Sequence, residues 1–274
     1  MANTLDSELS RFSLTGIVVV ITGCTGVLGS AYCKAFSLRG AHLVMADLAD
    51  RTPILAAETL AIETGNPTLG VNCDVTNEQN VSDLFTEALQ RFGRVDVVIN
   101  NAAATGEHLM REGDAFADFE QYPLSVWEKV INTNLTGMFL VAREGGKALL
   151  KSDGGSMINV SSIYGVVGPD HRLYEDMPFR SFAAYSAAKA GVHGLTQWLA
   201  TYWGEKNIRV NTLVPGGVNN GHSETFKARY SQRTPMHRMA EKDDLVGMMI
   251  YLATDASRYC TGQQFIVDGG LSAW

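Results

Sequence analysis

The sequence has few cysteines and no long apolar run, and each shortage excludes a class of protein. Its four cysteines are scattered without CxxC spacing, which is typical of reduced thiols in a cytoplasmic protein rather than of a disulfide framework. These are Cys24, Cys33, Cys73 and Cys260. The longest apolar run, residues 17–21, is far too short to cross a bilayer. We therefore expect a cytoplasmic protein that does not span a membrane.

Positive charge is also scarce, because 22 Lys and Arg face 29 Asp and Glu, giving a net charge of −7. With no basic block, neither nucleic acid nor an anionic membrane surface is an expected partner. The six histidines are dispersed, and no His, Cys and acidic cluster has metal-ligand spacing, so no metal is expected.

The sequence also lacks a signal peptide pattern and any segment with the composition of a linker between domains. Residues 1–11 are polar and lack the basic and apolar regions of a signal peptide, so a flexible N-terminus is expected there. With no repeat or Pro/Ser-rich linker further on, residues 12–274 are predicted to form one domain, with a hydrophobic content of 46% that suits a globular core.

Strand and helix patterns alternate along the chain. Alternation of this kind predicts an α/β fold, a Rossmann-like, doubly wound parallel sheet of about seven strands between two helical layers. Expected strands are 17–21, 41–46, 70–73, 95–99, 156–160, 208–214 and 264–267. The first expected helix ends near residue 38, and the others cover 53–64, 77–92, 124–151, 182–205 and 241–254. Thr76 with Gln79 suggests a capping box at the start of the helix 77–92. Segments 104–122 and 163–180 are polar and irregular, and 219–237 is polar with some helix expected.

A glycine-rich turn joins the first expected strand to the first helix. Gly23, Gly26 and Gly29 fall three residues apart. Glycines there let the backbone approach a pyrophosphate, and the helix N-terminus attracts the anion. A tight turn without a ligand is the alternative. Expected cofactor contacts in this turn are Gly23, Thr25, Gly26, Val27, Leu28 and Gly29.

Two aspartates follow the next strands. Asp47 closes the second strand, where a carboxylate binds the adenosine ribose hydroxyls and repels a 2′-phosphate. It therefore favours NAD (NADH) over NADP, although Arg51 is a nearby cation. Asp74 ends the third strand, where it could bind the adenine amino group. Each aspartate could instead be a turn or cap residue.

Tyr185 and Lys189 lie four residues apart in an expected helix, so they share one face. A tyrosine hydroxyl has a pKa of about 10 and is a poor base at neutral pH. A neighbouring ammonium favours the phenolate, so the pair can act as an acid/base couple. The alternative is one core tyrosine and one solvated lysine.

In this order these motifs resemble the short-chain dehydrogenase/reductase family over nearly the whole chain. The similarity includes the glycine turn, Asp74-Val75, Asp96-x-x-x-Asn100-Asn101-Ala102, Asn134-Leu135, Ser162, Tyr185 with Lys189, Pro215-Gly216 and the 261–270 tail. The resemblance implies catalysis by Asn134, Ser162, Tyr185 and Lys189, with the lysine also binding the nicotinamide ribose. It adds the cofactor contacts Leu48, Val75, Asn101, Ala102, Ala103, Tyr185, Lys189, Pro215, Gly216, Val218 and Asn220, and it implies a homodimer or homotetramer.

The chain departs from the family pattern mainly in length, because a long segment separates Ser162 from Tyr185. The irregular segments carry His108, Arg111, His171, Arg172, Glu175, Arg180, Asn219, His222 and Arg229. A polar lining suits a sugar, polyol or sugar-acid substrate, so the predicted function is NAD(H)-dependent interconversion of a secondary alcohol and a ketone. Alternatives are a 3-oxoacyl thioester reductase and a cofactor-binding regulator without turnover. Charges that merely solvate the loops are a further explanation of these residues.

Overall fold

Seven parallel strands form one sheet in the order β3-β2-β1-β4-β5-β6-β7. The computed structural model describes residues 10–109 and 116–274. The strands are β1 Val18–Thr22, β2 His42–Asp47, β3 Thr68–Asn72, β4 Val97–Asn100, β5 Gly155–Val160, β6 Ile208–Pro215 and β7 Gln264–Val267. The predicted Rossmann-like doubly wound sheet is confirmed, with β3 beginning two residues earlier and β4 two residues later than expected.

The central strand β1 explains where a ligand can bind. All five of its residues are buried, as expected for a β-branched run covered on both faces. It pairs with β2 on one side and with β4 on the other. The chain therefore reverses direction across the sheet between β1 and β4, and ligands of such sheets bind at the carboxyl edge beside this reversal.

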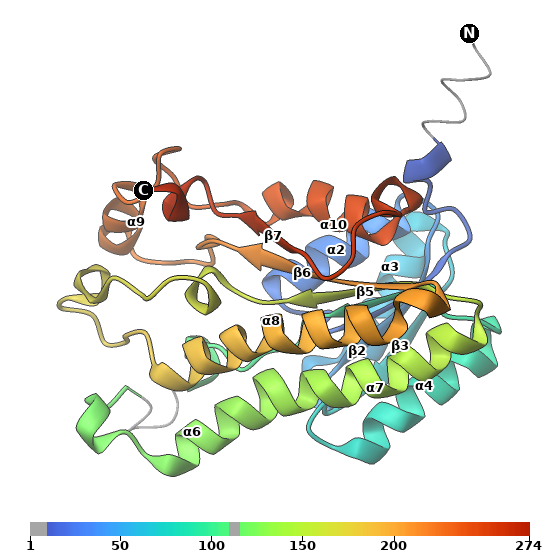
Figure 1. The fold of residues 1–274 in the computed structure, drawn as a ribbon, viewed down its shortest axis with the longest axis horizontal. Helices are drawn as coiled ribbons and strands as arrows, with labels where there is room; N and C mark the ends of the chain where they lie inside the picture. The colour runs from blue at the N-terminus through green and yellow to red at the C-terminus, as the bar shows by residue number, and fades with distance from the viewer. Residues whose placement is uncertain (1–9, 110–115) are drawn as a thin grey trace, which may run out of the picture.

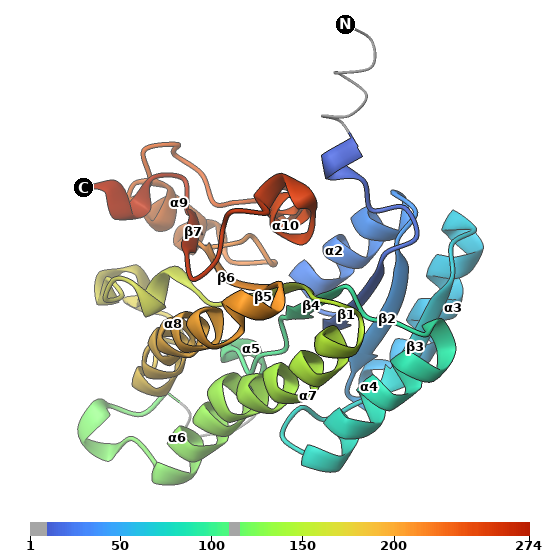
Figure 2. The same ribbon diagram turned by 45° about the vertical axis from the view of Figure 1, so that its right-hand side comes forward.

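Two helical layers cover the sheet (Figures 1 and 2). Helices α2, α3 and α10 contribute to one buried cluster, and α4, α7 and α8 contribute to the other. The helices are α2 Val27–Ser37, α3 Pro53–Thr64, α4 Glu78–Phe92, α5 Gly106–Leu109, α6 Leu124–Ile131, α7 Gly137–Lys151, α8 Ala183–Trp203, α9 Glu224–Ser231 and α10 Val246–Ala253. The connecting segments lie at the carboxyl edge of the sheet.

The structure corrects three details of the predicted helices. The expected helix 124–151 is two α-helices joined by a π-turn, η4 Asn132–Thr136. The expected helix 241–254 begins as a 3-10 turn, η8 Lys242–Leu245, before α10. The N-cap of α4 is Asn77 rather than Thr76, because the Asn77 side chain accepts from the backbone N–H groups of Gln79 and Asn80.

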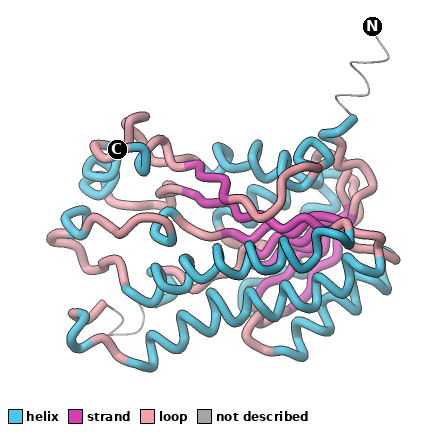
Figure 3. The backbone as a smooth tube through the Cα atoms, in the orientation of Figure 1, coloured by secondary structure: helices cyan, strands magenta, loops and turns pink. Residues whose placement is uncertain are grey.

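The described parts of the segments predicted to be irregular gather at the carboxyl edge of the sheet (Figure 3). Segment 163–180 contains two 3-10 turns, η5 Ile163–Gly165 and η6 His171–Tyr174. It packs against α9 through a shared apolar cluster, as the neighbouring yellow and orange ribbons in Figure 1 also show. These segments therefore cover the strand ends, and we call segments 163–180 and 219–237 the roof.

The last residues of the chain lie at the border of this edge. The predicted flexible N-terminus falls outside the described residues up to residue 9, and Ser10–Phe12 form the 3-10 turn η1. The last turn, η10 Leu271–Ala273, lies near α9 in Figures 1 and 2. Within residues 10–109 and 116–274, no helix combines the length and apolar composition needed to cross a membrane.

Candidate active site

The glycine turn lies between β1 and α2, at the reversal point of the sheet. Gly23 has a φ of 66°, and an added Cβ would approach the Cα of Ala102 to 2.8 Å. A Cβ on Gly29 would approach the carbonyl oxygen of Gly23 to 2.0 Å, so only glycine allows this close packing. Gly26 has no side chain to cap α2. The first N–H groups of the helix, at Val27, Leu28 and Gly29, therefore suit an external anion.

Asp47 lies at the end of β2 and faces the glycine turn. Its Oδ2 accepts hydrogen bonds from the Thr25 backbone N–H at 3.0 Å and from the Thr25 hydroxyl at 2.7 Å. Its Oδ1 accepts from the Leu48 backbone N–H. Asp47 thus orders the turn, and its carboxylate retains further lone pairs for ribose hydroxyls. The two interpretations of this residue, as a turn residue and as a cofactor ligand, are compatible.

Asp74 has a structural role that is visible directly. Its Oδ1 accepts from the backbone N–H and the hydroxyl of Thr76, which forms a turn before α4. The neighbouring Val75 is buried and borders Gly137 of α7. The helix-start interpretation therefore has direct support, and an adenine contact would have to use the other carboxylate oxygen.

The end of β4 is joined to the glycine turn by Asn101. The Asn101 amide nitrogen donates to the carbonyl groups of Thr22 and Gly23. In return, the Thr22 hydroxyl accepts from the backbone N–H groups of Asn101 and Ala102. Asn101 thus positions the turn with its side chain. The backbone of Ala102 and Ala103 can border a ligand there.

The π-turn η4 carries Asn134 to the segment that follows β4. Asn134 is fully buried. Its Oδ1 accepts from the Ala104 N–H at 2.6 Å, and its Nδ2 donates to the Ala104 carbonyl at 3.0 Å. Both ends of the amide are therefore occupied by one residue. A proton relay at Asn134 would have to use its backbone carbonyl rather than its side chain.

Helix α8 brings Tyr185 and Lys189 together beneath the roof. The Lys189 Nζ lies 5.8 Å from the centre of the Tyr185 ring. The 3-10 turn η5 presses on α8, because a Cβ on Gly165 would lie 2.6 Å from the Lys189 carbonyl carbon. Ser162 directly precedes this turn and caps it by accepting from the Tyr164 N–H. Three of the four residues predicted to be catalytic therefore meet at the junction of β5 and α8.

Burial controls the pKa of both groups on α8. Burial raises the pKa of Tyr185, and a hydrogen bond with Ser162 partly opposes this effect. The sequence had predicted a tyrosine pKa lowered by Lys189. Burial also lowers the pKa of Lys189 from 10.5 to about 8. A positive charge that is so poorly solvated strongly attracts a nearby anion.

The remaining predicted cofactor residues follow β6. Pro215 ends that strand, and Gly216 donates its backbone N–H to the Val267 carbonyl of β7. Val218 makes an isolated bridge with Ala240. Asn220 is exposed, and its backbone N–H donates to the His222 ring. Because β6 runs parallel to its neighbours β5 and β7, the residues that follow it lie at the carboxyl edge of the sheet.

Two tyrosines of the roof, Tyr164 and Tyr174, lie near Tyr185, and Tyr230 lies beside these two. The hydroxyls of Tyr164 and Tyr174 lie 2.9 Å apart, and the Tyr230 hydroxyl accepts from the Gly217 N–H. Burial raises the pKa of Tyr164 and raises the pKa of Tyr174 and Tyr230 to about 12. The proximity of Tyr185 adds to this effect at Tyr164 and Tyr174. At neutral pH these phenols are therefore neutral hydrogen-bonding groups.

Sequence reasoning missed several of these residues. The Tyr164–Tyr174 pair depends on the fold of segment 163–180, and no local spacing indicates it. Thr22 had a signal, because it directly precedes the first glycine of the turn. Arg111 and the side chain of His108, which were expected to line the pocket, lie outside the described residues.

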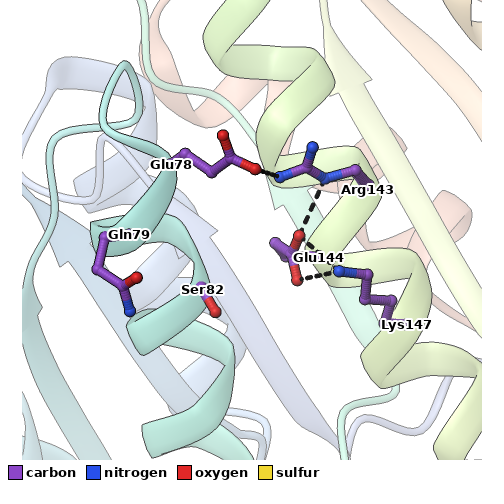
Figure 4. A pocket seen from close by; sticks show the side chains of 6 residues that line it. All are labelled: Glu78, Gln79, Ser82, Arg143, Glu144 and Lys147. Carbon is purple, nitrogen blue, oxygen red and sulfur yellow. Dashed lines mark hydrogen bonds and ion pairs between the residues drawn. The ribbon is translucent and has the colours of Figure 1, made fainter.

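A charged cleft of about 390 Å³ lies elsewhere, between α4 and α7 (Figure 4). Its lining residues are Glu78, Gln79, Ser82, Arg143, Glu144 and Lys147. Arg143 pairs with both glutamates, and Lys147 pairs with Glu144 at 2.8 Å. None of the predicted site residues lines this cleft. Its charges already neutralise one another, so it is best described as a surface ion-pair network.

Comparison with known proteins agrees with this geometry. Residues 25–272 match a protein-family model described as enoyl-(acyl carrier protein) reductase. The chain is 32% identical to a 3-oxoacyl-[acyl-carrier-protein] reductase of Synechocystis sp., covering 94% of this chain and 98% of that protein. It is 34% identical to the trans-4-hydroxycyclohexanecarboxylate dehydrogenase of Sinomonas cyclohexanicum, covering 93% of each. It is 32% identical to a probable galactose dehydrogenase of Rhizobium meliloti, covering 92% and 94%.

A solved structure is similar over almost its whole length. The gluconate 5-dehydrogenase from Burkholderia cenocepacia, in complex with NADP and tartrate, has a TM-score of 0.85 and 26% identity, covering 97% of this chain and 99% of that one. Fold and site thus define a nicotinamide dinucleotide-dependent oxidoreductase that acts on CH–OH groups. The chain belongs to the short-chain dehydrogenase/reductase family.

Proposed function

We propose that this protein interconverts a secondary alcohol and a ketone on a sugar, polyol or sugar acid, with NAD(H) as cofactor. The observation that carries the substrate class is the group of neutral tyrosine hydroxyls around Tyr185. Phenols of this kind can hydrogen-bond the hydroxyl groups of a substrate. The galactose and gluconate dehydrogenases among the similar proteins support the same substrate class.

The proposed reaction uses four residues of this chain. Bound NAD would supply the hydride acceptor for oxidation of the alcohol. Tyr185 accepts the hydroxyl proton as general base, and Ser162 hydrogen-bonds the reacting oxygen. The buried ammonium of Lys189 favours the Tyr185 phenolate by charge attraction and binds the nicotinamide ribose. Asn134 acts from the π-turn, by holding Ala104 and by presenting its backbone carbonyl to a proton relay.

The glycine turn and the neighbouring strand ends form the proposed cofactor site. The turn and the N-terminus of α2 would bind the pyrophosphate, and the strand ends would border the rest of the dinucleotide. Contacts are proposed for Gly23, Thr25, Gly26, Val27, Leu28, Gly29, Asp47, Leu48, Asp74, Val75, Asn101, Ala102, Ala103, Tyr185, Lys189, Pro215, Gly216, Val218 and Asn220. Asp47 supports NAD over NADP, because its carboxylate would repel a 2′-phosphate.

A substrate panel tests this function. Purified protein is assayed for NADH formation with sugars, polyols and sugar acids, and for NADH or NADPH consumption with 3-oxoacyl thioesters. Turnover of a member of the first group with NAD is the expected result. Activity confined to acyl thioesters would remove the sugar proposal.

A 3-oxoacyl thioester reductase is the second candidate. It is supported by the description of the matched family model and by the Synechocystis relative. It predicts a preference for NADPH, which the carboxylate of Asp47 disfavours. A regulator without turnover has weaker support, because all four catalytic positions are filled. Absence of turnover across the panel, with dinucleotide binding retained, would favour that alternative.

We propose further that residues 12–274 act as one domain in the cytoplasm and assemble into a homodimer or homotetramer. The four cysteines are unpaired, as expected in a reducing compartment. Large apolar side chains are exposed on α7 and α8, namely Phe139, Leu150, Trp198 and Tyr202. Such a surface suits a subunit interface. Light scattering of the purified protein would give the mass of the assembly.

A further inference from the structure

His193 lies one helical turn beyond Lys189 and contacts the same strand end. Its Nε2 is 3.2 Å from the Ser161 hydroxyl oxygen. Ser161 follows β5, and its hydroxyl donates to the Lys189 carbonyl at 2.8 Å. The residue before it, Val160, accepts a hydrogen bond from the Lys189 ammonium at 2.8 Å. Two successive residues of one strand end therefore hold Lys189, at its backbone and at its charged end.

The hydrogen bonds determine the tautomer of His193. A serine hydroxyl has one proton, and here that proton is donated to the Lys189 carbonyl, which can only accept. The Ser161 oxygen must therefore accept from His193, so Nε2 carries a proton. Nδ1 is then a bare acceptor in the neutral ring, and it has no hydrogen-bond partner among the described residues. The residue is more than nine-tenths buried, so its surroundings hold this tautomer.

The charge state of His193 follows from the same neighbours. Burial and the nearby Lys189 ammonium both lower the pKa of His193 below 6.5. Lys189 is the charged group that faces it, and Ser161 is its polar neighbour on the strand side. Across the neutral range the ring is therefore a hydrogen-bond donor without charge. A cation at this position would instead repel the Lys189 ammonium.

We propose that His193 is a positioning residue that acts on Lys189 through Ser161. The imidazole occupies the acceptor site of the Ser161 hydroxyl and so directs its proton to the Lys189 carbonyl. This fastens the turn of α8 that carries Lys189 to the end of β5. The inference rests on the catalytic role proposed for Lys189, and it does not depend on which substrate is used.

A double-mutant cycle tests the linkage. His193→Leu and Ser161→Ala should each lower kcat about tenfold, since small displacements of catalytic groups cost at least that much. The double variant should be no slower than Ser161→Ala, because both changes break one chain of contacts. His193→Gln, which retains an N–H donor near the Nε2 position, should recover most of the activity. Multiplicative losses in the double variant would overturn the proposal.

The pH profile separates positioning from simple loss of stability. In His193→Leu the loosened turn admits water to Lys189, so the alkaline limb of the kcat profile should move to higher pH. Ser156→Ala is the matched control, because Ser156 lies on the same strand and makes a similar buried bond to the Leu252 carbonyl. It should be destabilised without a shift of that limb. An equal shift in the control would contradict the proposal.

A spectroscopic measurement requires no substrate. Long-range proton–nitrogen correlation NMR of the wild-type protein should show His193 neutral and protonated at Nε2 between pH 6.5 and 8. A proton on Nδ1, or a charged ring in that range, would overturn the inference. If no panel substrate is turned over, the proposed function fails, while this measurement still decides the arrangement at His193.

Discussion

The ammonium of Lys189 donates a hydrogen bond to the Val160 carbonyl across 2.8 Å, while the Tyr185 ring centre lies 5.8 Å away. The lysine is 2% exposed, so very little water solvates its charge. It is tied to the sheet rather than to the tyrosine hydroxyl. The end of β5 thus holds the charge that the reaction needs, at a cost in stability that depends on pH.

Stability should increase between pH 8 and 9.5 because of Lys189. Burial lowers its pKa from 10.5 to about 8. In this window the unfolded chain binds a proton that the folded chain has lost, so stability rises with pH. The gain is about 1.5 kcal/mol. Urea unfolding at both pH values should show this rise in the wild type and not in Lys189→Met, and an equal rise in the variant would contradict the assignment.

Tyr185→Phe should abolish turnover and leave NAD binding nearly intact. The change removes one hydroxyl and keeps the ring that packs against Phe182. Loss of a general base lowers the rate by about 10² to 10⁴. Steady-state kinetics and NADH fluorescence titration measure the two effects. Retained activity would show that another group transfers the proton.

Asn134→Ala should destabilise the protein as well as impair it. The substitution leaves the N–H and carbonyl of the buried Ala104 without their partners. Two such groups cost about 2 to 4 kcal/mol. Asn132→Ala, in the same π-turn, is the matched control for urea unfolding. Equal stability of the two variants would mean that the bonds to Ala104 contribute little.

Asp47→Asn should raise the affinity for NADPH relative to NADH by about tenfold, because the amide removes the repulsion of a 2′-phosphate and largely preserves the shape that Thr25 contacts. Asp50→Asn, an exposed neighbour, is the control. Fluorescence titration with both cofactors gives the ratio. If the wild type already binds NADPH more tightly than NADH, the role proposed for Asp47 is wrong.

Tyr174→Phe should weaken substrate binding without unfolding the roof. The ring would keep its contacts with Phe179 and Phe226, while the hydroxyl next to Tyr164 is lost. We expect a rise in KM of about tenfold for a polyhydroxylated substrate, from one lost hydrogen bond. The fully exposed Tyr259→Phe is the control. An unchanged KM would remove Tyr174 from the substrate site.

Much of the fold could be predicted from local patterns. A β-branched run such as 17–21 has to be buried on both faces, and its alternation with helices leaves few topologies other than a doubly wound sheet. The glycine turn could be recognised in the sequence because a Cβ at Gly23 or Gly29 would clash with nearby backbone, so both positions have to be glycine. Boundaries were less predictable, since the π-turn at 132–136 carries an Asn134 side chain that binds Ala104, a residue thirty positions earlier in the chain.

By itself the sequence determined the order of elements, the glycine turn and the spacing of Tyr185 and Lys189, because backbone sterics and helical periodicity are local. Tertiary structure decided what surrounds them. Burial raises the pKa of Tyr185, where the sequence predicted a lowered one. Val160 and Ser161, at the end of β5, form hydrogen bonds with Lys189. Solvation and hydrogen bonding depend on segments far apart in the chain, and no local pattern records which of them will meet.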